Sequence, residues 1–128
     1  MNLILQPNRW SCVPTSAAMV FGVSLEKLIK EIGHDGSAIR WPSLAEPHQR
    51  LGFHIEEIQE AGFSFGFLLA SFSSGFKYIP EGLDDPHDYK FTKYKEALKR
   101  FDGILLGRHK RTGNPHAVAW NSIERVVY

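Results

Sequence analysis

The chain has 128 residues, 43% of them hydrophobic, which is enough for one domain with its own core. Fifteen lysines and arginines against 14 aspartates and glutamates give a formal charge of +1, so we expect no general attraction to nucleic acids or membranes. A single cysteine excludes an internal disulfide, and without a signal peptide or an apolar run of membrane-spanning length we expect one cytoplasmic domain over residues 1–128.

The only cysteine lies where a loop gives way to a helix of small apolar residues. Pro14 is tolerated in a first helical turn, which predicts a helix that begins near Val13. The small residues 16–18 allow close packing, so we expect this helix to be central and buried. Cys12 at its N-terminus faces unpaired N–H groups and the positive end of the helix dipole, which favour a thiolate. Cys12 is therefore the candidate nucleophile; the alternative is a small buried apolar residue.

A second amphipathic helix follows the first. Gly22 predicts the end of the first helix, Ser24 caps the next, and Gly33 ends it. The segment His34–Ser37 is a predicted turn. We expect His34 to be solvated there and assign it no chemistry.

The middle of the chain contains short and mixed signals. A capping box at Ser43–Glu46 predicts a helix through Leu51, and Phe53–Ile58 is predicted as a strand. The alternating aromatic and small residues 62–72 fit either a segment of the core or the wall of a peptide-binding cleft. The acidic, turn-rich stretch 79–89 is expected to form a surface loop for substrate selection.

The last third of the chain predicts one helix and three strands. The helix covers Thr92–Phe101, and the strands are Ile104–His109, a run that begins at His116, and Glu124–Tyr128. The basic turn Arg108–Arg111 is expected to be solvated. Helices packed on a C-terminal antiparallel sheet make an α+β domain.

Three residues in this order resemble a known catalytic scheme. Gln6 precedes Cys12 by six residues, Cys12 opens Cys-x-Pro-Thr-Ser-Ala-Ala-Met, and His116 lies in Pro-His-Ala-Val-Ala-Trp. This pattern resembles the papain-like cysteine peptidases, in particular the compact bacterial double-glycine (bacteriocin) leader peptidase-like domains, over the whole chain except residues 63–92. The resemblance implies a papain-like fold and a peptide or protein substrate. We expect no cofactor, and no metal site at His87, because no second spaced set of His or Cys accompanies it.

The same resemblance implies a role for each residue. Cys12 would attack a peptide or isopeptide carbonyl and form a thioester, while its own N–H and the Gln6 amide stabilise the oxyanion. His116 would hold the thiolate as an ion pair and then protonate the leaving group. Trp10, Asn114 and Trp120 are predicted to bind substrate.

The residue that would orient His116 is the weakest part of the pattern. Asn121 is the only Asn or Asp after His116, and it lies five residues along the same strand with the opposite side-chain direction. A predicted turn at Ser122–Ile123 pairs Trp120 with Arg125, which leaves position 129 opposite His116. Two alternatives therefore stay open beside the peptidase: a deamidase or acyltransferase with the same chemistry, and a catalytically impaired peptide-binding module.

Overall fold

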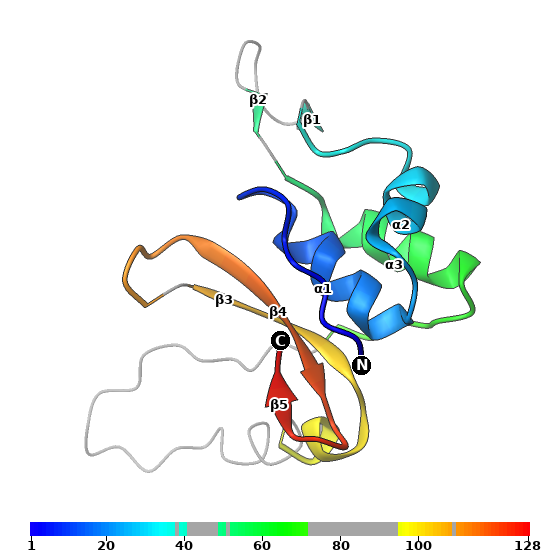
Figure 1. The fold of residues 1–128 in the computed structure, drawn as a ribbon, viewed down its shortest axis with the longest axis vertical. Helices are drawn as coiled ribbons and strands as arrows, with labels where there is room; N and C mark the ends of the chain where they lie inside the picture. Colours follow the sequence, from blue (N-terminus) through cyan, green and yellow to red (C-terminus); the bar gives the residue numbers. More distant parts are fainter. Residues whose placement is uncertain (38, 41–48, 51, 72–94, 109) are drawn as a thin grey trace.

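The computed structural model describes residues 1–37, 39–40, 49–50, 52–71, 95–108 and 110–128. It has an α+β architecture in which a layer of helices packs against a small antiparallel sheet (Figure 1). The α+β class predicted from the sequence is confirmed. The elements are α1 Cys12–Phe21, α2 Leu25–Ile32, β1 Ile39–Arg40, β2 Gln49–Arg50, α3 Ile55–Ser64, β3 Gly103–Arg108, β4 Pro115–Asn121 and β5 Val126–Val127, with a further helical segment at 95–100.

The helix α1 is the centre of the structure, as its small residues predicted. It packs against α2 and α3 and also against β3 and β4. Ala17 and Ala18 are completely buried, together with Leu28 of α2 and Ile58 of α3. Their short side chains let the neighbouring elements approach closely, so the residues of one helix contribute to the interface with every other layer.

The ends of the first two helices follow the predicted signals. Gly22 and Gly33 both adopt the left-handed conformation, and α1 and α2 end at these residues. The Ser24 hydroxyl accepts a hydrogen bond from the Lys27 N–H at 3.2 Å, which caps α2. These boundaries are set by local interactions and needed no tertiary information.

The predicted strand Phe53–Ile58 is wrong, because this segment enters the helix α3. The Glu57 carboxylate accepts the N–H of His54 at 2.8 Å and so stabilises the start of the helix. Ile58 and Ala61 then lie on one buried face against α1. Gly62 lets α3 approach α1 closely, since a Cβ there would lie 2.8 Å from the Phe21 ring.

Two other predictions for the middle of the chain have different outcomes. The predicted helix through Leu51 is wrong at Gln49–Arg50, which form β2 and pair with β1; its remaining residues lie outside the described ones. In the aromatic stretch, Leu69 packs on the core whereas Phe63 and Leu68 are largely exposed. The predicted loop 79–89 lies outside the described residues.

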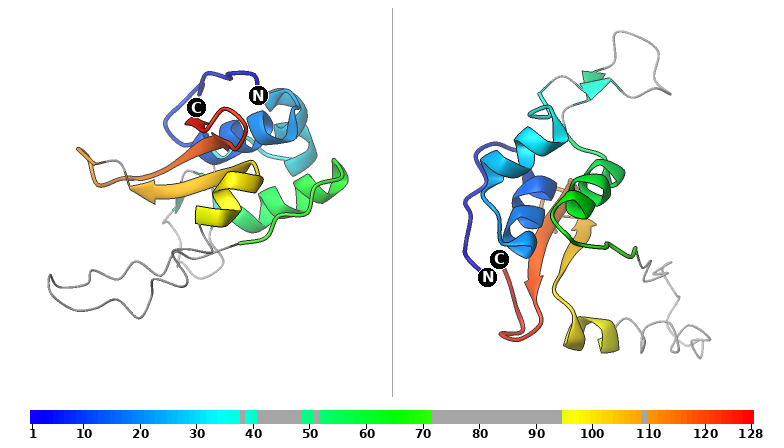
Figure 2. Two further views of the ribbon diagram at one scale, coloured as in Figure 1. Left: turned by 90° about the horizontal axis from the view of Figure 1, so that it is seen from below. Right: turned by 90° about the vertical axis from the view of Figure 1, so that its right-hand side faces the viewer.

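The sheet has the order β3-β4-β5, with both pairs antiparallel. Ile104 lies opposite Ala119, and Ile104 packs against the helical core, so this face of the sheet points to the helices. Figure 2 shows α1 and α2 on one side of the β3–β4 hairpin and the segment 95–100 on the other. The strand β3 is half-buried over residues 103–105 and exposed over residues 106–108, so the buried strand that its apolar residues predict is wrong.

The predicted register of the last hairpin is wrong. Trp120 pairs with Val127 instead of Arg125, and the turn covers residues 122–125. Arg125 adopts a positive φ of 57°, which closes this longer turn. Tyr128 exchanges two backbone hydrogen bonds with Ala119, three residues short of His116.

No single helix in the described ranges is long and apolar enough to cross a membrane. The helices α1 and α2 taken together reach that length and composition but are bent by 113° at their junction, and α1 is a buried core helix.

Candidate active site

The N-terminus of α1 carries Cys12 as its first residue. Ser11 occupies the capping position, but its side chain makes no hydrogen bond to the helix. Within the described residues the N–H groups of Cys12 and Val13 have no hydrogen-bond partner, and Pro14 has no N–H. Cys12 as a residue is half-buried. The start of this helix therefore keeps N–H donors without a partner in the described residues beside the cysteine, an arrangement that suits an anion.

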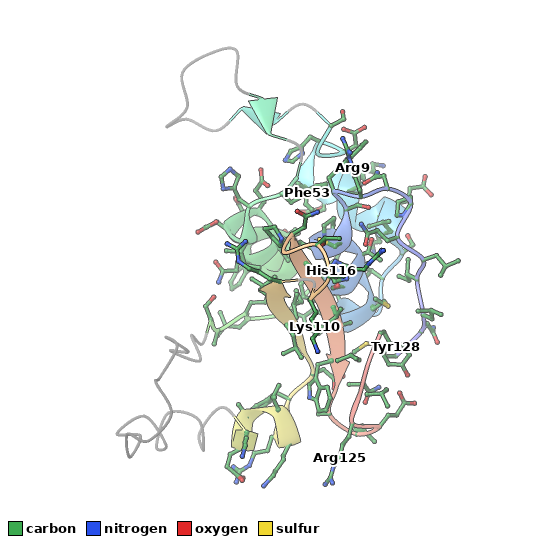
Figure 3. All side chains as sticks on the ribbon, turned by 90° about the vertical axis from the view of Figure 1, so that its left-hand side faces the viewer. Arg9, Phe53, Lys110, His116, Arg125 and Tyr128 are labelled. Carbon is green, nitrogen blue, oxygen red and sulfur yellow. The ribbon has the colours of Figure 1, made fainter. Side chains whose placement is uncertain are left out.

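The strand β4 carries His116 and lies directly against α1. The histidine is the second residue of the strand, opposite Gly107 of β3, and its side chain is exposed. Figure 3 shows it on the outer part of the hairpin, between Arg9 in the loop before Cys12 and Lys110 in the β3–β4 turn. The fold thus brings the two elements that carry Cys12 and His116 into contact.

Buried and less buried side chains alternate along β4, and this alternation sets the face of the sheet on which the His116 side chain lies. Ala117 and Ala119 are buried toward the helices, so His116 belongs to the other set of side chains with Val118 and Trp120. Within the described residues β5 pairs with β4 only from Ala119 onward. The side chain of His116 therefore lies on the face of β4 opposite to the one that packs on α1, beyond the part of β4 that pairs with β5.

Gln6 lies in the exposed loop before α1. Its Nε2 donates a hydrogen bond to the carbonyl oxygen of Asn8. A side-chain amide has two N–H groups, so one remains after this bond.

Asn121 has its hydrogen bonds in the β4–β5 turn. Its Oδ1 accepts the N–H groups of Ile123 at 3.0 Å and Glu124 at 2.9 Å, and its Nδ2 donates to the Glu124 carboxylate at 2.9 Å. The residue is buried and five positions along the strand from His116, about 17 Å by the rise of a strand. These contacts give Asn121 a role in the turn.

The three residues predicted to bind substrate differ in their surroundings. The Trp10 indole N–H donates to the Asp35 carbonyl at 3.2 Å, and the Trp120 indole N–H donates to the Leu98 carbonyl at 2.7 Å. Trp10 thus fastens the loop before Cys12 to the turn after α2, and Trp120 fastens the segment 95–100 to the sheet. Asn114 is exposed, two residues before His116.

The prediction that His34 is a solvated surface residue is wrong. Its Nδ1 accepts the Gly36 N–H at 3.1 Å, so its Nε2 is the nitrogen that donates to Glu57 at 2.8 Å. The ring stacks on Phe53 at 5.1 Å between centroids. The sequence signal that was overlooked is Glu57, which caps α3 with one carboxylate oxygen and holds His34 with the other.

A second overlooked feature is Thr15 in the first turn of α1. The residue is 4% exposed, and its hydroxyl is buried with no hydrogen-bond partner among the residues that the structure describes. Buried hydroxyls are rarely left in this state, and the position is one turn after Cys12. In the described part of the chain, no three His, Cys, Asp or Glu side chains are grouped to hold a metal ion.

The chain matches no protein-family model, no curated protein and no solved structure at a significant level. The assignment of function therefore depends on the residues and their geometry.

Proposed function

We propose that the protein is a cysteine peptidase of the papain-like type, with Cys12 as nucleophile and His116 as its acid–base partner. One observation carries this proposal: the helix that begins with Cys12, and whose first N–H groups have no partner in the described residues, packs along the strand that begins with Pro115 and His116. A cysteine at a helix start with N–H donors, on a helix that packs against a strand with a histidine, supports the proposal of an acyl-transfer site.

The chemistry needs two half-reactions. The Cys12 thiolate attacks a peptide or isopeptide carbonyl, and the N–H of Cys12 with the remaining N–H of Gln6 stabilises the oxyanion. His116 protonates the leaving amine, and a thioester forms on Cys12. His116 then takes a proton from water, which attacks the thioester and releases the acid.

The pH dependence of Cys12 alkylation by iodoacetamide tests this proposal. The chain contains no other cysteine, so alkylation reports this thiol alone. We expect native Cys12 to react well below the pH of a free thiol, about 8.5, and His116→Ala to lose this reactivity. The matched control is His34→Gln, which removes a histidine bound to Glu57 and should keep the native profile. If the native chain and His116→Ala share the profile of an ordinary thiol, the peptidase is disproved.

A second candidate is a peptide-binding module without catalysis. It is favoured by the hydrogen bonds of Asn121 within the β4–β5 turn, which hold the candidate orienter of His116 in that turn. An ordinary thiol profile supports this candidate. A reactive Cys12 that transfers its acyl group to an amine, or that releases ammonia from glutamine, would instead indicate an acyltransferase or a deamidase.

A further inference from the structure

We propose that Asn8 is a positioning residue of the active site, because it orients the Gln6 amide for the oxyanion. The inference rests on the proposed function. Its starting observation is that three hydrogen bonds of the loop before Cys12 converge on Asn8.

The carbonyl oxygen of Asn8 decides which end of the Gln6 amide is presented. A carbonyl only accepts hydrogen bonds, so it selects the NH₂ group of Gln6 and not its oxygen. The bond uses one of the two N–H groups and leaves the other as a donor. An amide turned by 180° would instead present its oxygen, which would repel an oxyanion.

The Asn8 carbonyl is itself held in place from two sides. The hydroxyl of Ser11, which is 3% exposed, donates to the same oxygen at 3.3 Å. The Asn8 side chain accepts the Trp10 N–H through Oδ1 at 3.1 Å, which closes a turn around Asn8. Because the Trp10 indole is bound to the Asp35 carbonyl, this turn is anchored to the helical layer.

The turn around Asn8 depends on the side-chain acceptor of this residue. Without Oδ1, the Trp10 N–H loses its partner and the peptide unit of Asn8 is free to rotate. The Gln6 amide would then lose its fixed orientation, although Cys12 and the start of α1 stay unchanged. The expected defect is therefore confined to the step that develops an oxyanion.

Two reactions of the same sulfur separate this defect from general damage. Acylation by p-nitrophenyl acetate passes through an oxyanion, whereas alkylation by iodoacetamide does not. We expect Asn8→Ala to lower the acylation rate by about tenfold, less than the loss of about 10² or more that removal of an oxyanion donor causes, and to leave the alkylation profile unchanged. Asn8→Ser keeps a side-chain acceptor and should recover most of the acylation rate. The control is Asn2→Ala, an exposed asparagine outside the loop that holds Asn8.

A double variant tests whether Asn8 acts through Gln6. If it does, Gln6→Ala combined with Asn8→Ala acylates at the rate of Gln6→Ala alone, because the second change has nothing left to orient. Additive losses, or an Asn8→Ala variant that acylates at the native rate, overturn the role of Asn8. Neither result touches the peptidase proposal, which depends on the His116-dependent alkylation of Cys12. If that reactivity is absent in the native chain, both proposals fail together.

Discussion

The helical layer and the β3-β4-β5 sheet differ in how completely their side chains are covered. Leu28 and Ile58 in the helical layer are 0% exposed, whereas Leu106 of β3 and Val127 of β5 are 59% and 56% exposed. In the described part of the sheet, full burial is confined to the face of β4 that touches α1. Stability therefore resides mainly in the helical layer, and the sheet carries His116 as an exposed residue.

His34 in the helical layer and His116 in the sheet also differ in how far they are covered. His34 in the helical layer is fixed by a backbone N–H, a carboxylate and an aromatic ring. His116 is exposed on a strand. A histidine bonded through both ring nitrogens supports packing, so His34 has a structural role, and His116 stays the candidate acid–base residue of the proposed peptidase.

The largest expected effect is at Ile58, with Leu106 as its counterpart in the sheet. Ile58→Ala removes a completely buried side chain and should lower the free energy of unfolding by about 3 kcal/mol. Leu106→Ala should lower it by less than about 1 kcal/mol, since that side chain is mostly exposed. Urea unfolding of both variants measures the difference. Equal losses would contradict the unequal cover of the two regions.

Two glycines with nearly the same φ provide the next test. Gly36, beside the helical layer, has φ +75°, and a Cβ there would lie 2.5 Å from Phe53 and 2.9 Å from the Gly52 carbonyl. Gly113, in the hairpin turn, has φ +69° and open space. We expect Gly113→Ala to cost about 1 kcal/mol of left-handed strain and Gly36→Ala at least about 2 kcal/mol, because Phe53 must also move. Thermal unfolding that gives equal losses would refute the close packing at Gly36.

The role of Asn121 in the sheet can be separated from a role in catalysis. Asn121→Ala leaves the N–H groups of Ile123 and Glu124 without their acceptor and should cost about 1–2 kcal/mol of stability. The pH profile of Cys12 alkylation should remain native. A profile shifted as in His116→Ala would instead show that Asn121 orients His116. Asn121→Asp, which keeps the acceptor beside Glu124 but adds a charge, should give an intermediate loss.

The Thr15 hydroxyl is buried in the helical layer and has no hydrogen-bond partner in the described residues. Thr15→Val keeps the shape of the side chain and removes a buried hydroxyl without a partner, so it should stabilise the protein by about 1 kcal/mol. Thr15→Ser keeps the hydroxyl and loses a methyl group, and it should be destabilising. Urea midpoints distinguish the two. A destabilised Thr15→Val would mean that the hydroxyl has a partner, such as a buried water.

The smallest effect concerns the exposed end of the sheet. The Tyr128 hydroxyl donates to the Glu124 carboxylate, which raises the pKa of Tyr128 above its ordinary value near 10. Because the pKa is higher in the folded state, the contribution to stability is present below about pH 10 and is lost as the pH rises through the raised pKa. Tyrosinate absorbance should show one late-titrating residue that is absent in Tyr128→Phe and shifts down in Glu124→Gln. Unchanged titration in Glu124→Gln would disprove the contact.

Much of the candidate site was accessible from sequence because its residues are marked by neighbours in the chain. Pro14 and the small residues after it identified the start of α1 and so the place of Cys12. The β-branched and aromatic run identified β4 and so the place of His116. The contacts that give Trp10, Trp120 and His34 structural partners span 22 to 25 residues, and no local pattern encodes them.

The sequence by itself determined the first two helices, their glycine ends, the α+β class and the strand of His116, because turns, caps and side-chain periodicity act over a few residues. Only the tertiary structure decided that Phe53–Ile58 enters a helix, since burial of Ile58 against α1 outweighs its strand propensity. It also decided the register of β5, where a left-handed Arg125 lengthens the turn, and the packing of α1 on β4. These outcomes depend on contacts between distant residues, whose energies appear only after the chain has folded.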